Sequence, residues 1–424
     1  MIKVLKKMAV YLMVVITIVT CGTIETEASS VDILNRNDTF DFAIYNNILE
    51  DMGLSKKDLY IEKAKINISQ EMSAIIPKEV NEYAKERFLP LIESVKDNLD
   101  AFNVVIDDNS DLQLGSPFVI YSVESIGTQE PIYYYPVLND NKIILTLYVI
   151  DCGGEYSAGI SSDYATQLDT LQYQKDDDYI FYEEENCIYA ENYKSQKMLY
   201  EFSMPKEIVY EHEDMNRRVF EDLSIENKVV AILNSYSNGN EIGIRDNENL
   251  LEFANGFSTK TANIVKLNTN NCLVPQGNNG NCWAASVATT LRYINFSKYR
   301  SLTATDVCDA MDIGYNTGAS IKTKQAALKK YGCTYSNLQY SQCSFSSVKT
   351  NILDQWPVLV SAFDSNSSGH AVTIVGYSTY GSIDQITFYN SGTDTCTSVE
   401  YKSAGTTFSY NNKKWTWKYT LSYE

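Results

Sequence analysis

One cysteine stands in the most constrained stretch of the chain, Gln276-Gly277-Asn278-Asn279-Gly280-Asn281-Cys282-Trp283-Ala284-Ala285-Ser286. Two glycines leave the backbone before Cys282 free to approach another chain closely. The residues after it favour a helix, so the thiol is expected at the first helical turn. This context predicts a catalytic nucleophile, whereas the ordinary alternative for one cysteine is a buried or disulfide-bonded residue.

A thiol in this position needs a cation nearby to react at neutral pH. Its ordinary pKa is about 8.5, and activated cysteines reach values roughly 5 units lower, which corresponds to about 7 kcal/mol. A helix N-terminus supplies at most about 2 kcal/mol of that. The chain has only two histidines, and His212 lies among acidic residues in a polar stretch. His370 opens an apolar segment that ends at Tyr377. It is predicted to pair with the thiolate as an imidazolium and to act as general base and acid.

The imidazole also needs an acceptor that holds its tautomer, and the reaction needs a donor for the oxyanion. Asn390 ends the next expected strand, and its amide oxygen suits the first role. Asp384 and Asp394 are rival acceptors. Gln276 is predicted to donate its side-chain amide to the oxyanion, beside the backbone N–H of the cysteine.

Three motifs occur in the order that papain-like cysteine peptidases show. The pattern Gln-Gly-x-x-Gly-x-Cys-Trp, the His-Ala-Val strand and the Asn-Ser dipeptide resemble that family over about residues 271–423. The Gly-His-Ala start and the large front region look most similar to the secreted bacterial staphopain-type branch. The resemblance implies an α+β fold with a helical lobe and an antiparallel β lobe. It assigns Cys282 as nucleophile, His370 as base and acid, Asn390 as orienting residue and Gln276 as oxyanion donor.

Two positions depart from papain itself. Asn279 stands where papain has a disulfide cysteine, so that bridge is absent. Gly392 stands where papain has a tryptophan that shields the Asn–His hydrogen bond. We therefore expect a wetter hydrogen bond here, with Trp415 or Trp417 as candidate shields.

Charge divides the chain into an acidic front and a mildly basic back. The net charge of −19 argues against nucleic acid as a partner. Residues 261–424 carry 13 Lys and Arg and 9 Asp and Glu, a net charge of +4, so the preceding residues carry −23. A polar linker between about Phe253 and Asn271 separates the two parts. We expect residues 29–260 to form a mixed, β-rich propeptide domain that inhibits the peptidase domain, residues 261–424. A solvated acidic surface explains the charge equally well.

Residues 1–28 have the pattern of a signal peptide. Lysines precede an apolar run from Met8 to Thr20, which is too short to span a bilayer comfortably. Thr26-Glu27-Ala28 then offers a cleavage site that would leave Ser29 at the new N-terminus. The expectation is secretion without a stable membrane span. Attachment of a lipid to Cys21 is the alternative.

The nine cysteines and two histidines show no CxxC pair, so no zinc cluster and no cofactor are expected. Five cysteines besides Cys282 fall in the back part. That odd number leaves at least one of them free or paired outside its domain. They are Cys272, Cys308, Cys333, Cys343 and Cys396.

Periodicity predicts a front part with one helix from Pro77, kinked at Pro90, followed by strands at 118–123, 132–137 and 142–150. The back part is predicted to place helices first and antiparallel strands afterwards. The helices are expected at 282–294, 303–311, 320–330 and 344–355, and the strands at 358–360, 370–377, 385–390, 397–402 and 415–423. The apolar residues 356–363 are expected to be core rather than a substrate pocket.

These features predict a secreted cysteine endopeptidase made as a zymogen. It would cleave protein or peptide substrates through an acyl-thioester intermediate, and its own propeptide would block the cleft until proteolysis. An acyl-transfer enzyme or amidase with the same Cys–His pair, such as a transglutaminase, deamidase or cell-wall amidase, is the first alternative. A non-enzymatic binding protein with a peptidase fold is the second. Asn390 and Gln276 together favour hydrolysis of peptides.

Overall fold

The structure is a computed structural model that describes residues 71–72, 75–96, 99–105, 112–123, 130–171, 179–184, 187–201, 220, 223–236 and 263–423. The expected signal peptide, Cys21, His212 and most of the linker lie outside these residues. The chain divides into two compact units, and every described residue belongs to the second, residues 66–424.

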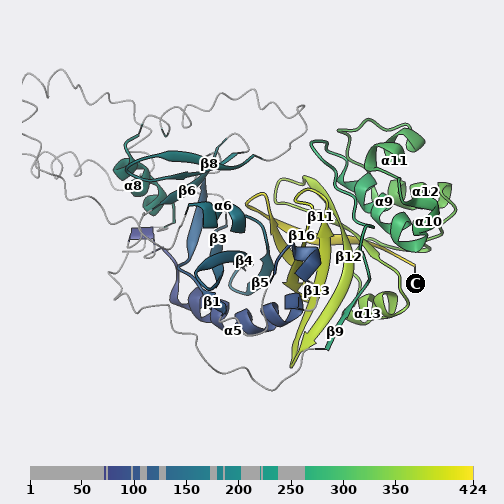
Figure 1. The fold of residues 1–424 in the computed structure, drawn as a ribbon, viewed down its shortest axis with the longest axis horizontal. Helices are drawn as coiled ribbons and strands as arrows, with labels where there is room; N and C mark the ends of the chain where they lie inside the picture. Colours follow the sequence, from purple (N-terminus) through teal and green to yellow (C-terminus); the bar gives the residue numbers. More distant parts are fainter. Residues whose placement is uncertain are drawn as a thin grey trace, which may run out of the picture. The chain divides into compact units, whose positions relative to one another are not determined.

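Between Cys282 and Lys330 the C-terminal region forms a group of helices, which Figure 1 shows gathered beside the strands. Three helices of this region begin at a residue whose side chain caps them. Thr303 forms a capping box with Asp306, and the hydroxyls of Ser320 and Ser344 each accept a backbone N–H of the first turn. None of the described helices is long and apolar enough to cross a membrane. The helices are α9 (Cys282–Ile294), α10 (Phe296–Tyr299), α11 (Ala304–Met311), α12 (Ile321–Lys330) and α13 (Phe345–Leu353).

The strands of this region form one antiparallel sheet with the order β10-β16-β11-β12-β13-β14. Strand β12 lies between β11 and β13 and also pairs with β9, while β15 pairs with β16. Apart from β9 and β10, the helices precede the strands, as predicted for an α+β arrangement. The strands are β9 (Asn263–Lys266), β10 (Asn337–Gln339), β11 (Val358–Phe363), β12 (Gly369–Tyr380), β13 (Ile383–Asn390), β14 (Thr395–Glu400), β15 (Thr407–Tyr410) and β16 (Lys413–Ser422).

The N-terminal region is rich in strands, as predicted. The turn between β3 and β4 places Asp140 and Asn141 at positive φ, which short polar residues tolerate. The elements are α5 (Lys78–Lys96), η1 (Leu99–Phe102), β1 (Leu112–Leu114), β2 (Phe118–Ser122), β3 (Ile132–Asn139), β4 (Lys142–Asp151), β5 (Tyr156–Ser161), α6 (Ala165–Thr170), β6 (Ile180–Glu184), β7 (Cys187–Glu191), β8 (Gln196–Glu201) and α8 (Ile225–Tyr236).

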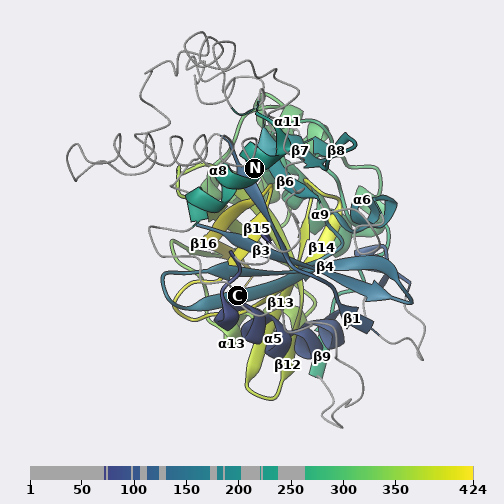
Figure 2. The same ribbon diagram turned by 90° about the vertical axis from the view of Figure 1, so that its left-hand side faces the viewer.

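The two regions share one continuous sheet. Strand β14 pairs antiparallel with β5 through Thr397 and Ser161, Ser398 and Ile160, and Val399 and Gly159. From β5 the order continues β4-β3-β2-β6-β7-β8, and the β2–β6 pair is parallel. Figures 1 and 2 both show α5 alongside the strands where the regions meet. That helix packs on β4, β5 and β14. Backbone pairing and helix packing therefore hold the regions together.

A buried ion pair lies at this junction. The Nε of Arg87, on α5, is 2.7 Å from Oε1 of Glu400, at the end of β14. The Glu400 side chain is 4% exposed, and it also accepts hydrogen bonds from the Tyr83 hydroxyl and, at 3.1 Å, from the backbone N–H of Ala158. Lys402 Nζ lies 3.6 Å from the same carboxylate. A buried carboxylate keeps its charge only with such partners, so the junction depends on them.

Removing the cation tests that dependence. In a Cys282→Ala chain, Arg87→Met leaves the Glu400 carboxylate without its closest cation, and the free energy of unfolding should fall by about 3 kcal/mol. Lys78→Met removes the exposed Lys78–Glu82 pair from the same helix and should change it by less than about 0.5 kcal/mol. Urea denaturation followed by circular dichroism measures both variants. Equal effects of the two substitutions would contradict the argument.

Candidate active site

Cys282 is the first residue of α9, as predicted, and its side chain is half-buried. Hydrogen bonds to the loop that contains Asn316 and Thr317 hold the chain on both sides of Cys282. The backbone N–H of Gly280 donates to Oδ1 of Asn316 at 3.0 Å, and the indole N–H of Trp283 donates to the Thr317 carbonyl at 2.9 Å. Gly277 has a φ of 62°, a left-handed conformation that favours glycine. These contacts fix where the thiol lies.

His370 and Asn390 meet directly. The strand pairing of β12 with β13 brings their ends together, and Nε2 of His370 lies 2.9 Å from Oδ1 of Asn390. The backbone N–H of Gly392 donates to the same oxygen at 3.0 Å. An amide oxygen only accepts, so Nε2 carries the proton and Nδ1 of the neutral ring is left as an acceptor. His370 is 5% exposed and Asn390 is 1% exposed.

The rival acceptors hydrogen-bond elsewhere. Asp384 accepts from the Thr379 hydroxyl at 3.2 Å, and Asp394 accepts from the Tyr389 hydroxyl at 2.6 Å. The imidazole thus has the neutral partner that the sequence favoured.

Aromatic rings cover the Asn–His hydrogen bond. The Tyr410 ring stacks on His370 with a centroid distance of 4.3 Å and an interplanar angle of 17°, and Trp415 lies 5.4 Å from the same ring. Trp417 instead directs its indole N–H to Tyr419 and Thr420. A Cβ atom at Gly392 would overlap with the Tyr410 hydroxyl. The missing side chain therefore makes room for the tyrosine, and the bond is shielded rather than wet.

Gln276 joins the cysteine segment to the loop after Asn390. Its backbone N–H donates to the Ser391 carbonyl at 3.0 Å, and its side-chain oxygen accepts from the Ser391 hydroxyl at 3.1 Å. Its side-chain nitrogen donates to the Asn279 carbonyl at 2.9 Å. An amide nitrogen has two protons, so one remains available for an oxyanion.

Two residues of this site, Tyr410 and Lys324, are not predicted from the sequence. Lys324, on α12, is 1% exposed, and its Nζ lies 3.1 Å from the Val360 carbonyl and 2.7 Å from the Ser361 hydroxyl. The available signal was its place on the buried stripe of α12, with Ile321 and Leu328. No comparable signal marks Tyr410, whose role arises from the β15–β16 hairpin.

Burial disfavours charge on both the thiol and the imidazole. Desolvation raises the pKa of Cys282, although the Lys324 charge and a hydrogen bond from the Ala371 backbone oppose it. Desolvation also lowers the pKa of His370 to about 4, with Asn390 opposing and Lys324 reinforcing the shift. Burial therefore opposes both charges of the thiolate–imidazolium pair that is expected from the sequence.

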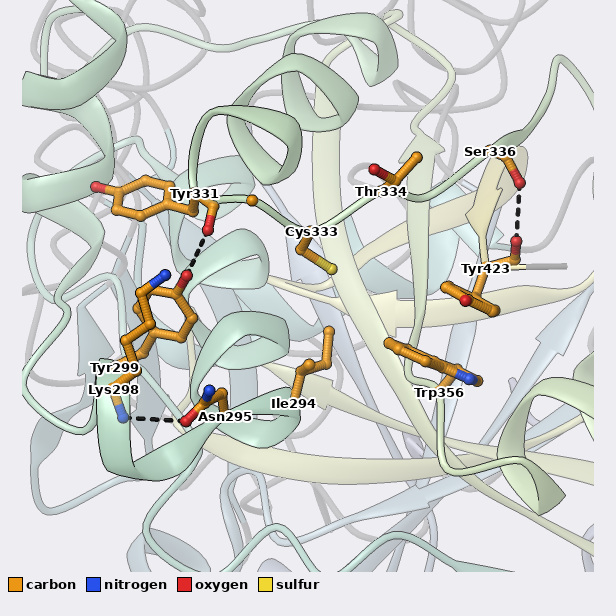
Figure 3. Close-up of a pocket in the computed structure, with 11 residues that line it drawn as sticks. Ile294, Asn295, Lys298, Tyr299, Tyr331, Cys333, Thr334, Ser336, Trp356 and Tyr423 are labelled. Carbon is orange, nitrogen blue, oxygen red and sulfur yellow. Dashed lines mark hydrogen bonds between the residues drawn. The ribbon is translucent and has the colours of Figure 1, made fainter.

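A pocket of about 680 Å³ lies at the other end of α9 (Figure 3). Ile294, the last residue of α9, borders it, and so do the stacked rings of Trp356 and Tyr423, with centroids 3.8 Å apart. Cys282 begins the same helix, so about 18 Å of helix separates this pocket from the thiol. The six described cysteines of the C-terminal region, Cys282 among them, are free thiols. No cluster of three or more potential metal ligands occurs in the described part of the chain.

The burial of His370 makes stability depend on pH. Its pKa falls from 6.5 to about 4 on folding, so the unfolded chain binds more protons between these values. Stability should therefore be lost as pH falls from about 6.5 to about 4, by up to about 3 kcal/mol. We expect the melting temperature of a Cys282→Ala chain to drop across this window. A further His370→Asn substitution should flatten the drop, and an unchanged profile would contradict the assignment.

The comparison with protein families agrees with this geometry. Residues 264–421 match the model of the Peptidase_C39 like family. A search of curated proteins finds no match. The matched residues run from β9 to β16 and contain all of the site residues described above, from Gln276 to Trp415. The C-terminal region, residues 264–421, is therefore a Peptidase_C39-like domain of the papain-like clan, and the protein is a cysteine-type peptidase.

Proposed function

We propose that this protein is a secreted cysteine endopeptidase made as a zymogen, of the staphopain type. The observation that carries the proposal is the buried Asn390–His370 hydrogen bond beside the thiol of Cys282. The Ala371 backbone, next to His370 in β12, hydrogen-bonds to that thiol. A nucleophile, a base of fixed tautomer and an orienting acceptor are thus arranged together.

In the acylation step, Nδ1 of His370 takes the proton of Cys282, and the sulfur attacks the carbonyl carbon of the peptide bond. The C=O π bond opens to an oxyanion, which the Gln276 side-chain amide and the Cys282 backbone N–H stabilise. When the C–N bond breaks, the leaving amine takes the proton from His370 and an acyl-thioester remains.

In the deacylation step, water replaces the amine. His370 takes a proton from the water as its oxygen attacks the thioester carbon, and the same donors stabilise the second oxyanion. The C–S bond then breaks, the acid product leaves, and the proton returns to the sulfur. Throughout, Asn390 keeps Nε2 protonated, so Nδ1 remains the atom that exchanges the proton.

Contacts between the two regions support a zymogen. The Tyr134 hydroxyl lies 2.9 Å from Oγ of Ser409. Ser409 directly precedes Tyr410 in β15, and the Tyr410 ring covers His370. Burial raises the pKa of Tyr410, and nearby Tyr200, on β8, raises it further. The N-terminal region thus packs against the strand that carries Tyr410, the residue that covers the imidazole. Removal of the N-terminal region would expose that side of Tyr410 to water. Rehydration would raise the pKa of His370 and favour the ion pair.

Export is proposed from the sequence alone. The lysines before the apolar run, and the Thr26-Glu27-Ala28 site after it, support a cleaved signal peptide ending at residue 28. The proposed propeptide then spans residues 29–260, and a cut in the polar linker would free residues 261–424.

Replacing the nucleophile tests the proposal. Purified Cys282→Ala chain should remain an uncut precursor and should not cleave casein, whereas the wild-type chain should mature and cleave it. Cys333→Ala, which removes a thiol far along the chain, is the matched control and should behave as wild type. Self-maturation of Cys282→Ala to the same fragment would refute autoprocessing. Incorporation of an added amine into casein without cleavage would favour an acyl-transfer enzyme.

The oxyanion role of Gln276 makes a kinetic prediction. Gln276→Glu keeps an acceptor for the Ser391 hydroxyl but loses the amide donor, and kcat should fall by about 10²–10³-fold with a small change in KM. Gln339→Ala, at a half-buried glutamine in β10, should leave both constants near wild type. Steady-state hydrolysis of a peptide substrate measures them. An unchanged kcat in Gln276→Glu would remove this residue from the oxyanion site.

A further inference from the structure

Lys324 occupies a position that a helix normally gives to an apolar residue. The buried side chains of α12 are Ile321, Lys324, Ala327 and Leu328, which share one face at helical spacing. The ammonium group is therefore inside the domain, where lysine is rarely found without an anionic partner.

The hydrogen-bond partners of this ammonium are neutral. They are the carbonyl of Val360 and the hydroxyl of Ser361, both on β11. No carboxylate among the described residues lies within ion-pair distance of Lys324. A buried cation with neutral partners costs free energy, so its presence points to an anion that forms nearby during function.

The thiol of Cys282 is the group beside it that can become an anion. In the β11–β12 register, Ser361 lies opposite Ala371 and Ala362 lies opposite His370. The oxygen that binds the ammonium is thus one strand away from the backbone that hydrogen-bonds to the thiol. Helices α12 and α9 pack on each other, and Cys282 contacts the same apolar cluster as Ile321.

We propose that Lys324 is a positioning residue whose fixed positive charge stabilises the thiolate of Cys282. This inference rests on the proposed function, because it assigns the source of the charge that the nucleophile requires. The proton leaves the sulfur for Nδ1 of His370, as in the mechanism above, and the negative charge on the sulfur then faces the Lys324 ammonium. No bond to Lys324 forms or breaks.

The other charges near α12 leave this pairing undisturbed. Among the described residues, the titratable groups that interact electrostatically with Lys324 are Cys282 on α9 and His370 on β12. Burial lowers the pKa of Lys324 to about 8, and Cys282 opposes that shift, so the amine is charged at neutral pH. The charged side chains of α11 and the lysine in the middle of β16 are exposed to solvent, where water screens them. They are Asp306, Asp309 and Lys418.

The test measures the thiol itself and does not require peptide hydrolysis. The full chain is alkylated with iodoacetamide across a pH series, and the rate at Cys282 is read by mass spectrometry of its peptide. Lys324→Gln keeps a hydrogen-bond donor without the charge, and Lys324→Met removes both. Each substitution should raise the midpoint of the pH–rate profile for alkylation of Cys282 by about 1 pH unit or more. Such a shift lowers the alkylation rate at pH 7 about tenfold. Lys324→Arg keeps the charge and should restore most of the rate.

Two comparisons make the outcome decisive. Lys329→Met removes an exposed charge from the same helix and should leave the Cys282 midpoint unchanged. Lys324→Met should melt at or above the wild-type temperature, because an unpaired buried charge is replaced by an apolar chain of similar length. A wild-type midpoint in folded Lys324→Gln would overturn the proposal. A different result would refute the proposed function, namely a wild-type chain whose Cys282 is alkylated but which cleaves no peptide.

Discussion

Two N–H groups converge on Oδ1 of Asn390, and the rest of the site is arranged around that oxygen. One comes from the His370 ring and the other from the Gly392 backbone. Together they set which ring nitrogen is free to exchange a proton. Such a contact keeps its strength only away from water, because a low local dielectric strengthens it. The rings of Tyr410 and Trp415 provide that environment, and the packing behind them comes from the N-terminal region. The orientation of one imidazole thus depends on strands from both regions.

The exclusion of water from the site also disfavours the charged groups that the reaction needs, and the site must offset this effect. The same burial that protects the hydrogen bond disfavours charge on both Cys282 and His370. An activated thiol needs about 7 kcal/mol of stabilisation, and a helix N-terminus offers about 2. The Lys324 ammonium differs from an imidazolium because its charge is present before any proton moves. A preformed charge needs no reorganisation during the reaction, which is the condition under which electrostatic stabilisation is most effective.

Local chemistry explains why much of this domain could be predicted. Caps at Thr303, Ser320 and Ser344 define helix starts through contacts within one turn, so the sequence carries that information. The His370–Asn390 contact follows from two adjacent antiparallel strands, which also lie close together in the chain.

Long-range contacts explain what could not be predicted. The pairing of β14 with β5 joins strands from different regions. The sequence of an edge strand does not specify which strand it will pair with. Tyr410 reaches His370 only because β15 folds back on β16. Lys324 resembles the surface lysines around it until the packing of α12 on α9 shows which face is buried.

Gly392 has a consequence for how this family of sites can vary. The Tyr410 hydroxyl fills the space that a side chain at position 392 would need. A side chain at 392 therefore requires a smaller residue at 410. The two positions are therefore interdependent, and the effects of changing them are not additive. Among relatives of this domain, a bulky residue after the Asn-Ser dipeptide and an aromatic residue at the end of the hairpin strand should exclude each other.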